Sequence, residues 1–138
     1  IERTVESLKG ARRATVHLYN ATAPVFRRVV FRGSKDDIKQ IAVDGTRLVM
    51  EYAEKLLGPE TEFGDQYSPE IFTDTELDFA LEVCEAVMDV WQPGPGREII
   101  LNGEIRTQDA PAVLEDVLLG LAAAPQVEGD RHDGCVTA

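Results

Sequence analysis

The sequence has 138 residues, of which 43% are hydrophobic and 28% charged, a size and composition that predict a single soluble globular domain. A formal net charge of −11 argues against a nucleic-acid surface, and no apolar stretch is long enough to span a membrane. The first residues show no signal-peptide pattern, so a cytoplasmic location is expected.

The charge and the cysteines are unevenly placed along the chain. Residues 56–96 contain ten acidic residues and no Lys or Arg, which indicates a solvated acidic helix face or, alternatively, a docking surface for a basic partner. Cys84 and Cys135 give neither a disulfide framework nor a zinc spacing. Cys84 lies in an apolar helical pattern and is expected in the core.

The first third of the chain predicts a helix end, a strand and a long helix. Apolar residues at near-helical spacing stop at Gly10, and the β-branched and aromatic residues 14–19 predict a strand. Ser34, followed three residues later by Asp37, resembles a capping box. Apolar residues then recur every three or four positions up to Leu56, so one amphipathic helix is expected there.

The next segment repeats this order. Residues 61–67 predict a weaker strand, after which Ser68-Pro69 is expected to turn the chain. A second capping box, Thr73 to Glu76, predicts the start of a helix that ends before Pro93. Residues 98–102 predict a third strand, covered on both faces.

Strands that alternate with helices favour right-handed crossovers and a parallel sheet, so the expected core is βαβαβ. After Asn102 the pattern changes. We expect residues 103–138 to form a divergent, unrelated tail with a helix near 109–124, ending in a loose polar segment.

Polar side chains gather where the predicted strands end. His17 and Tyr19 share one side of the first strand, Ser68 and Glu70 follow the second, and Asn102 ends the third. In parallel α/β folds these ends open on one face, where such groups could orient a carbonyl substrate and move a proton. Each also has a structural alternative, since a lone His or Tyr on a strand often only packs and a loop carboxylate is often only solvated.

Several motifs, in order and at plausible distances, resemble the long-form 2-isopropylmalate synthases over residues 1–102. They are Gly10 to Ala14, Val16 to Thr22, Arg28 to Arg32, Tyr67 to Glu70, Thr73 to Leu77, Val83 to Val87 and Arg97 to Asn102. The resemblance implies an internal segment of a (β/α)8 barrel that condenses acetyl-CoA with 2-oxoisovalerate in leucine biosynthesis, using a divalent metal. It also implies that His17, Tyr19 and Ser68 bind the 2-oxoacid and that Glu70 is the acid/base candidate.

The sequence also departs from that family. The family's metal ligands come from an Arg-Asp pair and a His-x-His pair, and this sequence contains neither. Its two histidines, His17 and His132, lie far apart. We therefore expect no metal site in this chain and no activity from it alone. The break in the resemblance after Asn102 could come from a truncation, an altered reading frame or a fused tail. Unpaired strand edges predict a homo-oligomer or a complementing chain. The alternative is a non-enzymatic interaction module or a partial gene product.

Overall fold

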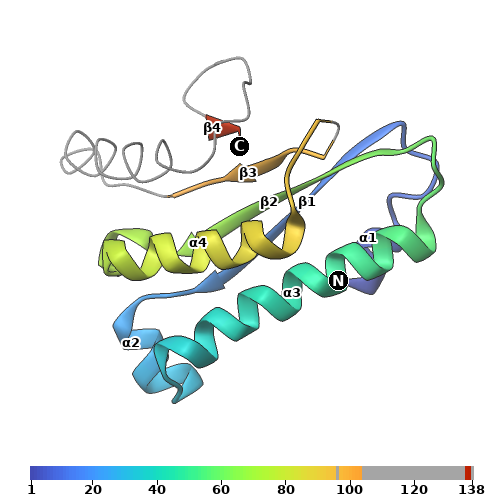
Figure 1. Ribbon diagram of the computed structural model, residues 1–138. Helices are drawn as coiled ribbons and strands as arrows, with labels where there is room; N and C mark the ends of the chain where they lie inside the picture. Colours follow the sequence, from blue (N-terminus) through green and yellow to red (C-terminus); the bar gives the residue numbers. More distant parts are fainter. Residues whose placement is uncertain (96, 104–135, 138) are drawn as a thin grey trace.

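The computed structural model describes residues 1–95, 97–103 and 136–137, and Figure 1 shows its sheet with helices along it. The elements, in chain order, are α1 (Glu2–Glu6), β1 (Arg13–Ala21), α2 (Pro24–Phe26), the π-helix η1 (Arg27–Phe31), α3 (Lys35–Leu56), β2 (Glu62–Glu70), the 3-10 helix η2 (Phe72–Asp74), α4 (Leu77–Trp91), β3 (Ile99–Leu101) and β4 (Val136–Thr137).

The sheet has the predicted parallel core. β1 pairs with β2 and β2 pairs with β3, each in parallel, so the expected βαβαβ arrangement is confirmed. β4 pairs antiparallel with β3, which was not predicted. The predicted helix near 109–124 lies outside the described residues.

The core lies between the sheet and the two long helices. α3 and α4 run side by side along one face of the sheet (Figure 1), where α3 contacts β1 and α4 contacts β2 and β3. Alternate strand residues enter this layer because the side-chain period of a strand is two. The buried side chains that form the cluster are Val5, Val16, Ile38, Ala42, Val49, Tyr67, Phe79, Val83, Val87, Trp91 and Ile99. Cys84, expected in the core, packs against this cluster as a partly buried residue.

α3 begins as predicted. The Ser34 hydroxyl accepts a hydrogen bond from the backbone N–H of Asp37, and the Asp37 carboxylate accepts one from the Ser34 backbone N–H. These reciprocal bonds satisfy two N–H groups that the first helical turn leaves without partners. The capping box at Ser34 and Asp37 is therefore confirmed.

The second predicted capping box, Thr73 to Glu76, is wrong. Phe72–Asp74 form a 3-10 turn, and α4 starts only at Leu77 with Glu76 as its N-cap and no side-chain cap bond. The reason is a distant partner, because the Glu76 carboxylate accepts two hydrogen bonds from Arg27.

The predicted turn at Ser68-Pro69 is also wrong, since β2 continues to Glu70. Tyr67 O accepts from Asn102 N on the β3 side, whereas Glu70 O accepts from Thr22 N on the β1 side. Backbone groups point alternately to the two neighbouring strands, so Pro69 faces the β3 side, beyond the last bond from β3. Its missing N–H therefore costs no ladder bond.

Candidate functional site

His17 and Ser68 lie on neighbouring strands and contact each other. His17 Nε2 and Ser68 Oγ are 2.7 Å apart, joining β1 to β2 on the face away from α3 and α4. Ser68 is only 2% exposed, whereas His17 is exposed. The buried Ser68 hydroxyl thus contacts one ring nitrogen of His17, while the rest of the exposed imidazole ring is accessible to a ligand.

Tyr19 lies two residues after His17 and on the same side of β1. Its ring centroid lies 5.5 Å from that of His17, the two planes are inclined at 57°, and the residue is 62% exposed. Tyr19 pairs in register with Ser68. The three candidate substrate-binding residues therefore form one cluster.

Glu70 is the last residue of β2 and pairs in register with Ala21, the last residue of β1. The strand alternation places it on the same side as Ser68, nearer the carboxyl end of the sheet. His17, Tyr19, Ser68 and Glu70 thus lie on one face toward one end, in strands rather than in the predicted loop. Asn102 follows β3, and its backbone N–H donates to Tyr67 O.

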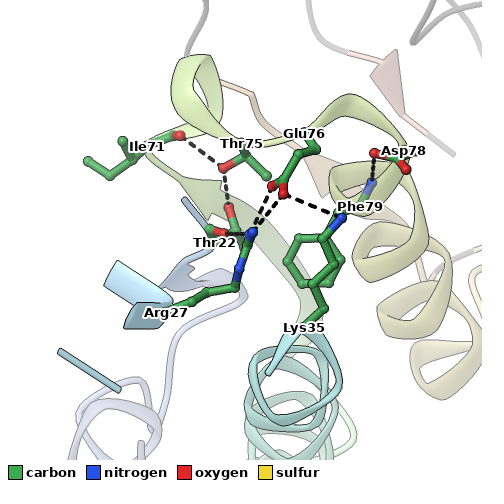
Figure 2. A network of polar contacts seen from close by, with 8 residues as sticks. All are labelled: Thr22, Arg27, Lys35, Ile71, Thr75, Glu76, Asp78 and Phe79. Atoms are coloured by element: carbon green, nitrogen blue, oxygen red, sulfur yellow. Dashed lines mark hydrogen bonds and ion pairs between the residues drawn. The ribbon is translucent and has the colours of Figure 1, made fainter. Parts of the chain in front are cut away.

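A polar network between the segments that follow β1 and β2 was not predicted (Figure 2). Arg27 donates to both oxygens of Glu76, at 2.9 and 2.7 Å, and Lys35 Nζ lies 3.4 Å from the same carboxylate. Hydrogen bonds from Arg27 lower the pKa of Glu76 to about 2, with Lys35 adding a smaller effect. The sequence signal was the crowding of arginines in the first quarter of the chain.

Two threonines complete the network. Thr22 Oγ1 and Thr75 Oγ1 are 2.7 Å apart, and Thr75 Oγ1 donates to Ile71 O at 2.9 Å (Figure 2). Both threonines are buried. Together with Arg27 and Glu76, they tie the segment after β1 to the segment after β2.

Asp65 is a second acid that the sequence did not single out as a candidate. The strand alternation directs it into the helix-covered core, where it pairs in register with Val16 and Ile99. It is 0% exposed, and neither carboxylate oxygen has a hydrogen-bond partner. Burial raises its pKa to about 7.

In the part of the chain that the structure describes, no three His, Cys, Asp or Glu side chains come together as a metal site. Within the same residues, no helix is long and apolar enough to cross a membrane.

Comparison with known proteins shows the family. Residues 1–104 match the HMGL-like family model, so the chain belongs to the HMGL-like family. It is 72% identical over 102 residues to a 2-isopropylmalate synthase of Streptosporangium roseum, a match covering 74% of this chain and 17% of that protein.

Two further relatives with the same name match more of the chain. The protein of Thermobifida fusca is 69% identical over 131 residues, or 95% of this chain and 21% of its own length. That of Ralstonia nicotianae is 57% identical over 131 residues, again 95% of this chain and 20% of its own length. The chain thus spans about a fifth of the curated relatives it matches, and the separate origin of residues 103–138 stays a prediction.

Proposed function

We propose that this chain forms the part of a 2-isopropylmalate synthase barrel that binds the 2-oxoacid and places Glu70 beside it. The observation that carries the proposal is the contact between His17 Nε2 and Ser68 Oγ, on the sheet face opposite the helices. In a closed barrel that face points inward, and ligands bind at the carboxyl ends of the strands.

Each side chain suits a different part of the substrates. 2-Oxoisovalerate offers a carboxylate, a ketone and a branched apolar chain. Ser68 holds one nitrogen of His17, so the other nitrogen can contact a substrate oxygen, while the exposed Tyr19 ring offers an apolar wall with a polar hydroxyl.

The proposed reaction is a Claisen-type acyl transfer. A base removes a proton from the acetyl methyl of acetyl-CoA, and the carbanion forms a bond to the ketone carbon while the ketone oxygen becomes an alkoxide and takes up a proton. Water then cleaves the thioester and releases the free CoA thiol. Glu70 is the proposed acid/base because its carboxylate has no hydrogen bond or ion pair to any described residue and is therefore available to a substrate.

The resemblance also implies a divalent metal that would polarise the ketone. The described residues do not fit it by themselves, because no three ligand-type side chains converge and His17 Nε2 is already held by Ser68. No step is therefore assigned through a metal here. A cytoplasmic location and assembly with a second copy or a complementing chain stay predictions.

The test is a graft. Residues 1–102 replace the matching segment of the Thermobifida fusca relative, and free thiol is measured with acetyl-CoA, 2-oxoisovalerate and a divalent cation. We expect the graft to release thiol and the purified 138-residue chain not to do so. Glu70→Gln in the graft should lower kcat by at least about 100-fold.

The matched control is Thr15→Ala, an exposed position two residues before His17 on the same side of β1. It should leave kcat within about twofold. An inactive graft, or a Glu70→Gln variant with full kcat, would contradict the proposed function.

A further inference from the structure

We propose that Thr22, Arg27, Thr75 and Glu76 form a positioning clamp that fixes the direction of the Glu70 side chain. The inference rests on the proposed function, in which Glu70 carries protons. None of the four residues is assigned to contact a substrate. They act through the backbone carbonyls of Glu70 and of the next residue, Ile71.

The first link joins the clamp to the backbone of Glu70. The Glu70 carbonyl lies 3.1 Å from the backbone N of Thr22 and 3.2 Å from its hydroxyl, both of which can donate to it. The Glu70 carboxylate, in contrast, has no bond to any described residue. The backbone therefore sets the direction of the Cα–Cβ bond from which this carboxylate extends, and hence so does whatever holds that backbone.

The second link is the turn directly after Glu70. Ile71 adopts φ 58° and ψ 43°, the left-handed conformation, which is strained for a β-branched residue by about 1 to 2 kcal/mol. Such strain persists only where the surroundings over-determine the backbone. Here Thr75 Oγ1 donates to Ile71 O at 2.9 Å and holds the turn.

The two hydroxyls must share their protons among three contacts. Thr75 Oγ1 bonds Ile71 O, Thr22 Oγ1 bonds Glu70 O, and the two hydroxyls lie 2.7 Å from each other. Two protons cannot fill three bonds at once, so the two hydroxyls compete for them. Without the Thr75 hydroxyl, Ile71 O loses its side-chain donor, while Thr22 can still donate to Glu70 O.

The third link anchors the threonines. Arg27 Nη1 donates to Thr22 O at 2.6 Å and also binds Glu76, the residue after Thr75 (Figure 2). The Arg27 side chain is 11% exposed and its guanidinium lies 5.0 Å from the centre of the Phe79 ring. A bidentate pair of this kind has a fixed geometry, so it sets the spacing between the two segments.

The decisive variant is Thr75→Val in the active graft, because valine keeps the β-branched shape and removes only the hydroxyl. We expect kcat to fall about tenfold, since small misplacements of a catalytic group have large effects on rate. KM for 2-oxoisovalerate should stay within twofold, because the contact between His17 and Ser68 is untouched. Thr75→Ser, which restores the hydroxyl, should restore kcat.

The matched control is Thr73→Val, the same substitution at an exposed position two residues earlier. It should change neither constant. If Thr75→Val does not fold, Glu76→Gln is the milder variant, since it keeps an acceptor for Arg27, and it should lower kcat several-fold with KM unchanged.

The two proposals fail in different ways. A graft without thiol release overturns the proposed function before any clamp variant is made. An active graft in which Thr75→Val keeps full kcat, or loses kcat and 2-oxoacid affinity together, overturns the positioning role alone.

Discussion

Glu76 and Asp65 are both acidic residues, but their surroundings are opposite. Glu76 lies between β2 and α4, whereas Asp65 lies in the core. Glu76 is 38% exposed at the side chain and is bound by Arg27 and Lys35. Asp65 is fully buried, and its carboxylate oxygens have no hydrogen-bond partner. A carboxylate is thus well paired where the proposed site needs order and unpaired where the fold needs an apolar side chain.

The two acids should affect stability in opposite directions as the pH changes. Burial raises the pKa of Asp65 from 3.8 to about 7. The free energy of unfolding linked to this shift is fully present below about pH 4 and is lost as the pH rises through 7. Bonding to Arg27 lowers the pKa of Glu76 from 4.5 to about 2. The free energy of unfolding linked to this shift is present above about pH 4.5 and is lost as the pH falls toward 2.

The largest expected effect comes from Asp65→Val. Valine suits a buried strand position and removes an unsatisfied polar group, so the free energy of unfolding should rise by about 1 to 3 kcal/mol at pH 5.5. The gain should be roughly 2 kcal/mol larger at pH 8, because the folded chain must then ionise Asp65 in the core. Urea unfolding at both pH values measures the difference and avoids the isoelectric point near 4.5.

Asp65→Asn is the control for this effect, because it keeps the shape and a buried polar group but cannot ionise. It should remove the pH dependence and give a smaller gain in stability. Equal gains for Asp65→Val at pH 5.5 and 8 would show that the carboxylate finds a partner in solution.

A smaller effect is expected from Glu76→Gln. The pair with Arg27 is partly exposed and screened by water, so its loss should lower the free energy of unfolding at pH 7 by no more than about 1 kcal/mol. The loss should shrink as the pH falls from about 4.5 toward 2, since the unfolded chain then binds a proton at Glu76 that the folded chain does not. Thermal unfolding of both chains across this range checks the sign, and a loss that grows with acid would contradict it.

Local patterns predicted most of the fold, whereas contacts distant in sequence produced its surprises. The period-two strands and the period-3.6 helices followed from burial, which each segment encodes for itself. A common rim for His17, Tyr19, Ser68 and Glu70 was expected from the parallel strand ends together with the family resemblance, whereas the direct contact between His17 and Ser68 was not predicted. Residues 24–31 were not expected to be helical, because apart from Pro24 nothing in that stretch signals a helix start.

Asp65 shows a different limit of sequence analysis. The strand expected over residues 61–67 is a weaker prediction because Gly64 and Asp65 lie within it and both residue types are unfavourable in strands. The structure builds both into β2 and buries the carboxylate. The parallel partners Val16 and Ile99 override the local preference, which no local window can reveal.

The smallest expected effect compares the two predicted capping boxes. Ser34→Ala removes an observed cap bond to the Asp37 backbone N–H and should lower the free energy of unfolding by about 1 kcal/mol, the usual value for an N-cap serine. Thr73→Ala, in the box that the structure lacks, should change it by less than about 0.5 kcal/mol, because Thr73 is exposed and caps nothing. Chemical denaturation of the two variants beside the parent chain measures both. Equal losses would mean that Thr73 does cap α4 in solution. The Glu76 carboxylate would then exchange between a state bonded to Arg27 and a state bonded to the first turn of that helix.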